Sequence, residues 1–354
     1  MRARVFAVLA LLLVSACSNG SSSSGDSGEK TIALFLPESK TTRYEAFDRP
    51  LFEAKVKSLC GDCKVIYSNA DQDAAKQQQQ VEAALTQGAD ALVLDAVDAS
   101  AVAPLVNQAK QKDVPVVAYD RLISGITYEY YVSFNNVRVG EMQGQALLDA
   151  LGKAGTTAKG QIVMINGAPT DPSSADYKKG AHNVLDGKVK VGREFDTPDW
   201  SPDKAQQEME QSITALGRDQ IVGVLSANDG MAGGAIAAMK RAGYSALPPI
   251  TGQDAELAAV QRILTGEQYM TIYLDIRSEA EKAAELAVAL VRGQKPDAPT
   301  QADNGSGKVP AFLLDPIAVT ADKVKDTIVK DGFYKPAEIC TAEVKAACTR
   351  EGIQ

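Results

Sequence analysis

The sequence contains a single histidine, His182, among its 354 residues. Histidine is the general base of Ser-His-Asp catalysis and a common metal ligand. Its near absence therefore argues against most hydrolases and metalloenzymes. We expect a protein without catalytic activity, without a cofactor and without a bound metal. We predict that His182 lies in a helix of a second domain, as a surface or packing residue.

Clustered positive charge is also absent. The chain has 37 basic and 45 acidic residues, a net charge of −8, and no block of five or more Lys or Arg. Binding to nucleic acid depends on such clusters, so nucleic acid is not an expected partner. The overall composition is that of a globular protein, and the length suits about two domains of roughly 150 residues each.

The amino terminus predicts export. Two arginines precede an apolar run, Val5 to Val14, which is too short to span a bilayer of about 30 Å but is typical of a signal peptide. The run leads into Ser15-Ala16-Cys17, which resembles a lipobox, where small residues admit the signal peptidase and the cysteine receives a diacylglycerol. We predict a lipoprotein signal peptide in residues 1–17 with Cys17 lipidated. The alternative is a plain signal peptide with an incidental cysteine.

Residues 18–30 are rich in serine and glycine. Such a segment cannot bury apolar surface and behaves as a flexible tether. We therefore expect the mature protein to lie outside the cytoplasm, in the periplasm or on the outer face of the cell membrane. Its lipid anchor is its only expected contact with the membrane.

Four further cysteines are expected to form disulfides, because the predicted compartment is oxidising. Four cysteines allow three connectivities, and close spacing favours the pairs Cys60–Cys63 and Cys340–Cys348. Cys60 and Cys63 also have the spacing of a redox motif. Thioredoxin-like motifs begin a helix after a strand, whereas here the pair follows a helical segment and precedes a strand. We therefore predict a structural bridge.

From residue 31 onward, short β-branched runs alternate with amphipathic segments, as in parallel sheets covered by helices on both faces. Strands are predicted at residues 31–36, 64–69, 89–96, 114–119, 130–134, 161–166, 189–195, 221–227, 249–252 and 269–274. Helices are predicted at residues 74–86, 101–112, 139–151, 204–216 and 279–291. The predicted fold class is α/β, with two doubly wound parallel-sheet domains.

Polar side chains follow these strands at their carboxyl ends, where open parallel sheets bind ligands. They are Lys40, Arg43, Tyr44, Asp120, Arg121, Asp171, Asn228, Asp229, Gln253 and Asp254. The planar groups of Asp, Asn and Arg can each hold two adjacent hydroxyls. Tyr44 and the only tryptophan, Trp200, can lie flat on the C–H face of a sugar ring. Any one of the strand-end residues can instead cap a helix or turn, but together they favour a polyol site.

Several blocks of sequence resemble the D-xylose-binding branch of the type I periplasmic sugar-binding proteins, which are the receptors of ATP-driven sugar importers. They are residues 116–123, 130–141, 226–236, 251–256 and 330–333. The resemblance implies two α/β lobes joined by three crossovers, with hinge closure on a ligand between them. It implies a monomer that binds a monosaccharide, most simply a xylose-like aldose, and delivers it to the permease subunits of an ABC transporter.

The resemblance also implies which parts of the chain form each lobe. Residues 31–135 with 275–311 would form the amino-terminal sugar-binding lobe, and residues 136–274 with 312–354 the carboxyl-terminal one. Hydroxyl-binding residues carried over by position are Arg43, Asp120, Arg121, Asp171, Asn228 and Asp254, and the stacking positions fall on Tyr44 and Trp200.

Three positions depart from the family pattern. Asp171-Pro172-Ser173 stands where the family has Asp-Asn-Asn, so the hydroxyl of Ser173 replaces an amide in the predicted site. Leu274 occupies the place of a lysine, and one extra residue falls between Arg43 and Phe52. These changes bear on the identity of the sugar more than on the fold.

Two other functions remain open from the residues alone. A sensory receptor for a membrane kinase or chemoreceptor would use the same site. Paired carboxylates can also act as acid and base in a sugar-cleaving enzyme. Against the enzyme, we expect the Arg and Asn partners to keep the carboxylates ionised, which suits them to accepting hydrogen bonds.

Overall fold

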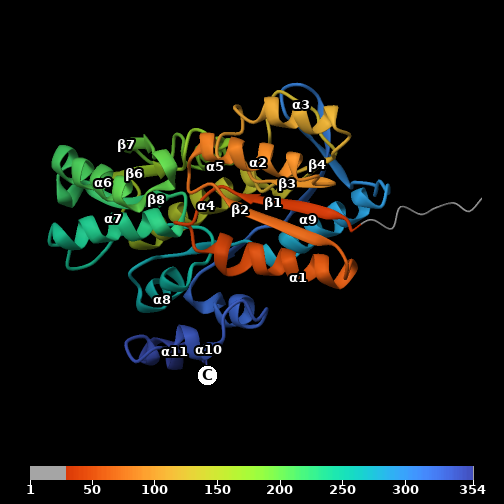
Figure 1. Ribbon diagram of the computed structural model, residues 1–354. Coiled ribbons are helices and arrows are strands. Elements are labelled where there is room, and N and C mark those ends of the chain that lie inside the picture. Colours follow the sequence, from red (N-terminus) through yellow and green to blue (C-terminus); the bar gives the residue numbers. More distant parts are fainter. Residues whose placement is uncertain (1–28, 354) are drawn as a thin grey trace, which may run out of the picture.

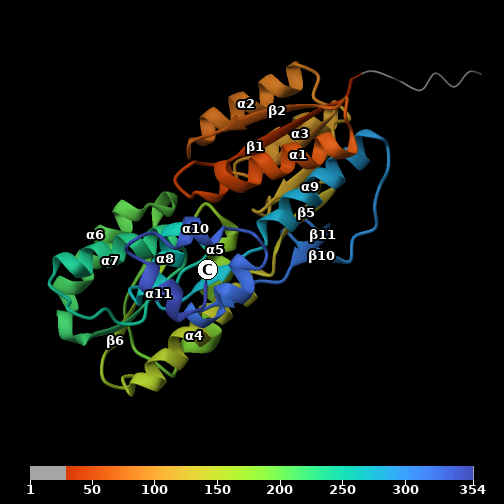
Figure 2. The ribbon, with the colours of Figure 1, turned by 90° about the horizontal axis from the view of Figure 1, so that it is seen from below.

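The computed structural model describes residues 29–353, which form two lobes (Figures 1 and 2). The predicted signal peptide, Cys17 and residues 18–28 of the predicted tether lie outside the described residues. No helix within residues 29–353 combines the length and the hydropathy that a membrane crossing requires.

The first lobe is built on a seven-stranded sheet in which only the outermost pair, β10 with β11, is antiparallel. Its strands, in spatial order, are β10 (Thr300–Asp303), β11 (Lys308–Leu314), β5 (Tyr130–Phe134), β4 (Val116–Tyr119), β3 (Ala91–Leu94), β1 (Thr31–Leu36) and β2 (Lys64–Asn69). Helices α2 (Ala74–Thr86) and α3 (Ala103–Gln111) cover one face, and α1 (Arg49–Leu59) and α9 (Ile276–Val291) cover the other (Figure 1).

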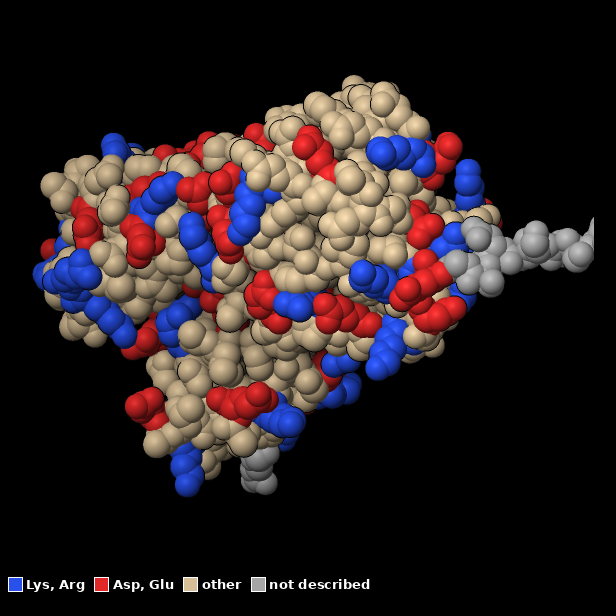
Figure 3. Space-filling model, viewed as in Figure 1, with Lys and Arg blue, Asp and Glu red and all other residues tan. Residues whose placement is uncertain are grey.

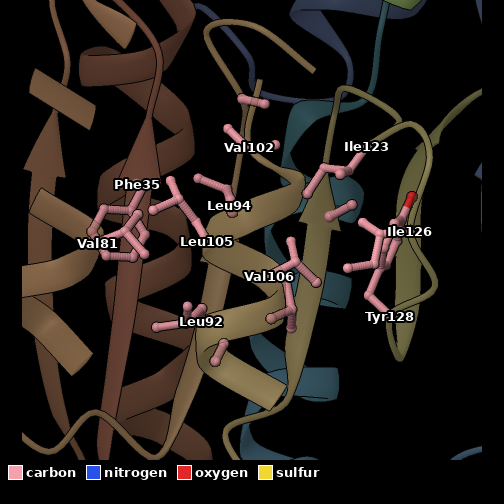
Figure 4. Packing of buried hydrophobic residues seen from close by; sticks show 14 of the residues in the cluster. Phe35, Val81, Leu92, Leu94, Val102, Leu105, Val106, Ile123, Ile126 and Tyr128 are labelled. Atoms are coloured by element: carbon pink, nitrogen blue, oxygen red, sulfur yellow. The ribbon is translucent and has the colours of Figure 1, made fainter. Parts of the chain in front are cut away.

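Alternating strand residues place an apolar layer on each face of this sheet. Phe35 and Leu92 pack against Val81 and Leu105 of helices α2 and α3 (Figure 4). On the other face, Leu34 and its neighbours pack against α1 and α9. Burial of both faces explains why the strands read as continuous apolar runs.

The second lobe contains a parallel sheet of three strands and an antiparallel pair, which together form a smaller layer. Its strands are β7 (Val191–Asp196), β6 (Gln161–Asn166), β8 (Ile221–Ser226), β9 (Thr271–Tyr273) and β12 (Ile317–Val319). The segment 249–252, predicted as a strand, makes only an isolated bridge between Ile250 and Val224, but it is hydrogen-bonded to both β8 and β9 and so completes the sheet.

Helices surround this second sheet as well (Figure 2). They are α4 (Asn136–Ala154), α5 (Pro172–Leu185), α6 (Pro202–Leu216), α7 (Asp229–Arg241), α8 (Leu257–Thr265), α10 (Pro336–Ile339) and α11 (Lys345–Arg350). Helices α4 and α5 pack on one face, and α6 and α7 on the other. Short helical turns complete the described chain: η1 (Tyr44–Asp48), η2 (Pro198–Trp200), η3 (Arg218–Gln220), η4 (Ala321–Lys323) and η5 (Lys325–Val329).

The chain passes between the two sheets three times. It leaves the first sheet after β5, returns after β9 into α9, and leaves again after β11 into β12. This confirms the predicted fold of two parallel-sheet lobes with three crossovers. The predicted lobe boundary at residue 311 falls inside β11, which stays paired with β5 as far as Leu314 opposite Phe134.

The bounds of several predicted elements agree with the structure, including β1, β2, β5, β6 and α2. Strands β10, β11 and β12 were not predicted. They are partly exposed, and Pro310 interrupts the β-branched pattern of β11. Such edge strands show little of the apolar signal on which the prediction depends.

The segment in which one extra residue was predicted, between Arg43 and Phe52, includes η1, which is a π-helix. A π-helical turn takes up one more residue than an α-helical turn. On η1 the ring of Phe47 stacks on Phe333 from the carboxyl-terminal segment, with ring centroids 4.2 Å apart. This stack is an aromatic contact between segments far apart in the sequence.

Both disulfides form with the predicted pairing. Cys60 and Cys63 join the end of α1 to the start of β2, and Cys340 and Cys348 join α10 to α11. Acidic and basic side chains are intermixed over the face seen in Figure 3.

Helices α4 and α5 approach closely because each has a glycine at the contact. A Cβ atom on Gly140 would lie 1.9 Å from the backbone oxygen of Tyr177, and one on Gly180 would lie 2.0 Å from that of Val137. These distances leave no room for a side chain. The close contact fixes the position of α5 against α4, and with it the positions of the side chains on α5.

We predict that Gly180→Ala lowers the free energy of unfolding by about 1–3 kcal/mol, because the added methyl group forces the two helices apart. Gly152→Ala is the matched control. Gly152 also lies in α4, but a Cβ there meets nothing within 4 Å, so the change should stabilise the helix by up to about 1 kcal/mol. Urea denaturation measures both effects. Equal effects of the two substitutions would contradict the close contact.

Candidate functional site

A polar cavity lies between the lobes, at the carboxyl ends of their strands. Its lining consists of Thr41, Arg43, Tyr44, Asp120, Arg121, Asp171, Tyr177, Trp200, Asn228, Gln253 and Asp254. The structure thus brings together every predicted ligand residue except Ser173. The cavity measures about 20 Å³, room for roughly one water molecule. A larger solute can enter only if the lobes move apart.

The guanidinium group of Arg43 is buried among three carboxylates. Its Nη2 lies 2.7 Å from Asp48 Oδ1 and 2.6 Å from Glu279 Oε2, and its Nη1 lies 3.3 Å from Asp120 Oδ1. Burial by itself would lower the pKa of Arg43, but attraction by Asp48, Asp120 and Glu279 raises that pKa well above its usual value. Arg43 therefore stays charged, and its carboxylate partners hold it at the cavity wall.

The second buried guanidinium group, that of Arg121, links the two lobes. Its Nε lies 3.3 Å from Asp95 Oδ1 at the end of β3 and 3.0 Å from Asp171 Oδ2 at the start of α5. Its Nη1 donates a hydrogen bond to the carbonyl oxygen of Ala96 at 3.0 Å. Because Asp95 and Asp171 belong to different lobes, Arg121 forms a direct ion pair across the cavity.

Three cavity residues adopt backbone conformations that are uncommon for residues other than glycine. The φ angles are 57° at Asp120, 52° at Trp200 and 91° at Asp254. Such conformations cost energy and are held in place by surrounding contacts. At Asp120, the carbonyl oxygen accepts hydrogen bonds from Ser133 Oγ at 2.7 Å and Tyr131 Oη at 3.2 Å.

Asp171 and Asn228 both cap a helix and line the cavity, the two roles considered for strand-end residues. Asp171 caps α5 by accepting a hydrogen bond from the backbone N–H of Ser173 at 2.8 Å, and Asn228 caps α7 by accepting one from Met231 at 2.9 Å. Both also line the cavity. Capping fixes their side chains and so supports the geometry of the site.

Ser173 and Leu274, the two departures from the family pattern, both lie outside the cavity lining. The hydroxyl of Ser173 accepts a hydrogen bond from Asn136 Nδ2 at 3.1 Å, on the side of α5 that faces α4. Its side chain is too short to serve the cavity as well. Leu274 is fully buried in the apolar core of the second lobe.

Two lining residues, Thr41 and Tyr177, were not predicted. Gln253 was among the predicted strand-end residues but not among those carried over as hydroxyl-binding. Thr41 lies in the loop after β1, beside Lys40 and Arg43, so its position carried the same signal as the predicted residues. Tyr177 lies inside α5, where no sequence pattern separates a cavity residue from a core residue. Its ring meets Trp200 edge-on, with centroids 6.3 Å apart.

The carboxylates of the cavity are not all kept ionised as expected. Burial raises the pKa of Asp254 to about 7, and burial also raises the pKa of Asp171 despite the nearby charge of Arg121. The expectation that arginine and asparagine partners keep the carboxylates ionised is therefore wrong for Asp254, whose carboxyl is partly protonated near neutral pH. Removal from water outweighs the attraction of the partner charges.

Other candidate centres lie away from this cavity. His182 is on α5, 2.8 Å from Asp186 Oδ1 and 3.1 Å from Glu194 Oε1, at the surface. Within residues 29–353, one cluster has the spacing of metal ligands, namely Cys60, Asp62 and Cys63. Both of its thiols are taken up by the disulfide.

A larger groove of about 1150 Å³ runs along α4 in the second lobe, and its lining includes Arg138 and Lys323. Most of its polar lining is at the surface, such as Asp149 and Lys153. It has no counterpart to the buried carboxylates and guanidinium groups that converge between the lobes. We therefore assign the candidate site to the interlobe cavity.

Two parallel-sheet lobes, three crossovers and a polar cavity between the lobes define a two-lobed binding protein of type I. The chain belongs to the periplasmic binding protein family, whose domain model matches residues 32–295. It is 36% identical to the D-xylose-binding periplasmic protein of Haemophilus influenzae over 323 residues, which cover 90% of this chain and 94% of the relative. It is also 36% identical to that of Escherichia coli K12, with 88% and 93% covered.

A solved structure shows the same fold. The solute-binding protein of an ABC transporter from Clostridium phytofermentans, with bound β-D-glucose, superposes with a TM-score of 0.81 at 28% identity. The match covers 88% of this chain and all of that protein.

The raised pKa of Asp254 predicts how stability depends on pH. Its carboxyl titrates near pH 4 in the unfolded chain and at about 7 in the folded protein, so between these values the folded protein binds more protons. Its contribution to stability is therefore complete below about pH 4 and is lost as the pH rises to about 7.

Asp254→Asn should remove this contribution, so that the ligand-free protein loses less stability between pH 5.5 and 7.5 than the wild type. Urea denaturation at the two pH values measures it. Asp297→Asn, an exposed loop position, serves as the control and should behave like the wild type. An unchanged pH dependence in Asp254→Asn would contradict the shift.

Proposed function

We propose that this protein is an extracytoplasmic solute-binding protein that captures a monosaccharide between its lobes and delivers it to the permease subunits of an ABC importer. The observation that carries the proposal is the interlobe cavity, in which two arginines, three aspartates and three aromatic rings converge from both lobes. Hydrogen-bonding groups of this kind match the vicinal hydroxyls of a sugar. The relatives that bind D-xylose support a xylose-like aldose as the ligand.

Ligand capture then depends on closure of the lobes. Arg43 and Asp120 would bind hydroxyls from the first lobe, and Asp171, Asn228 and Asp254 from the second. A ligand that contacts both sides stabilises the closed arrangement over the open one. To shift the two populations from 1:99 to 99:1, this difference must reach about 5.5 kcal/mol.

We propose the same two lobes as the sequence analysis, with one boundary moved. Residues 31–135 and 275–314 form the first lobe, and residues 136–274 and 315–354 form the second. The pairing of β11 with β5 supports the shift to residue 314. We also propose that the protein acts as a monomer. We propose that it has no catalytic activity, which its membership of a binding-protein family supports.

We predict that Asp120→Asn weakens sugar binding roughly 10- to 100-fold, because a charged hydrogen-bond acceptor contributes about 1.5–3 kcal/mol. Isothermal titration calorimetry with the best sugar from a thermal-shift panel of xylose, glucose, galactose, fructose, ribose and arabinose measures this. The matched control is Asp113→Asn, since Asp113 has the same φ of 57° but is exposed at the surface. Unchanged affinity in Asp120→Asn would contradict the site.

The lipid anchor is proposed on the sequence of residues 14–17. We expect Cys17→Ser to abolish incorporation of labelled palmitate and to move the protein from the membrane fraction to the soluble fraction. Cys60→Ser, which removes a disulfide partner but keeps Cys17, should leave the protein in the membrane fraction. Continued labelling of the Cys17→Ser protein would rule out this anchor.

A further inference from the structure

Tyr177 lies at the cavity wall contributed by the second lobe. Its side chain is 5% exposed, and α5 holds it there through the close contact with α4 at Gly140 and Gly180. Trp200 packs against one edge of its ring, and Trp200 in turn lies over Gly167, where a Cβ atom would come within 2.0 Å of the indole. The ring of Tyr177 is therefore fixed in place.

The hydrogen-bonding capacity of Tyr177 is only partly used. Its Oη accepts a long hydrogen bond from Gln253 Nε2 at 3.4 Å, and the hydrogen bonds found among residues 29–353 give its own proton no acceptor. Burial and the carboxylates of Asp120, Asp171 and Asp254 raise the pKa of Tyr177 well above its usual value. The phenol therefore keeps its proton and remains available as a donor.

The side chain of Gln253, next to Tyr177, has a hydrogen-bond acceptor without a partner. Its Nε2 lies 3.3 Å from Asp254 Oδ1, which orients the amide, and its Oε1 is buried without a hydrogen-bond partner in the described structure. Buried polar groups are nearly always paired, and leaving one unpaired is energetically costly. Tyr177 and Gln253 thus offer a free donor and a free acceptor side by side in one cavity wall.

We infer that Tyr177 and Gln253 form a specificity-determining pair that recognises one particular hydroxyl of the bound sugar. A hydroxyl both accepts and donates hydrogen bonds, so it can accept from Tyr177 Oη and donate to Gln253 Oε1. A deoxy sugar that lacks this hydroxyl leaves both protein groups unpaired. This inference rests on the proposed function and adds the residues that select among sugars.

The test combines Tyr177→Phe, which removes a single oxygen atom, with the tightest-binding sugar of the panel and its monodeoxy analogues. Calorimetry should show about tenfold weaker binding of the parent sugar by the variant. One monodeoxy analogue should bind the wild type and Tyr177→Phe equally, because its missing hydroxyl is the partner of Tyr177. The other analogues should keep the tenfold difference between the two proteins.

Tyr128→Phe is the matched control. Tyr128 is also 5% exposed and its hydroxyl has no hydrogen-bond partner in the described structure, but it lies in the core of the first lobe (Figure 4). This variant should bind every sugar as the wild type does. If Tyr177→Phe binds the parent sugar as tightly as the wild type, or if its loss is the same for all analogues, the pair does not select a hydroxyl. If the wild type binds no sugar of the panel, the proposed function itself fails.

Discussion

The pairing of two buried guanidinium groups is the constraint on which the site depends. A charge removed from water must be matched by nearby opposite charge, and Arg43 and Arg121 are 4% and 1% exposed. Each guanidinium group is therefore paired with acidic side chains from several elements of the fold. Their partners are Asp48, Asp95, Asp120, Asp171 and Glu279. The outcome is a small polar cavity lined mostly by buried side chains.

The two arginines serve the architecture in different ways. Arg43 binds Glu279 of α9, the helix that returns to the first lobe after the second crossover, and so ties this helix to the sheet it covers. Arg121 binds Asp171 of the second lobe, so one of its contacts must break whenever the lobes separate. The stack of Phe47 on Phe333 is a second contact between the amino- and carboxyl-terminal parts of the chain. Closure thus combines ionic and aromatic contacts.

The two walls of the cavity differ in how fully their polar groups are paired. In the first lobe, Arg43 and Asp120 have several protein partners, so their positions are set before any ligand arrives. In the second lobe, the proton of Tyr177 and the Oε1 atom of Gln253 have no partner among the described residues. Arg43 and Asp120 are therefore suited to general binding of hydroxyls, and the proposed pair of Tyr177 and Gln253 to discrimination among ligands.

Most of the fold could be predicted from local patterns, because period and β-branching are properties of neighbouring residues. The cavity residues that directly follow strands, such as Asp120 and Asn228, could be found for the same reason: parallel strands end at one edge. Tyr177 could not be found, since a helix residue facing a cavity and one facing the core have the same spacing.

The sequence by itself determined the α/β class and most of the cavity lining, and cysteine spacing favoured the disulfide pairs found in the structure. Only the tertiary structure decided that Glu279 supports Arg43 from 236 positions away, that Ser173 faces α4, and that burial raises the pKa of Asp254 to about 7. The physical reason is that partners, distances and exclusion of water arise from contacts between remote segments, which leave no periodic mark on the chain.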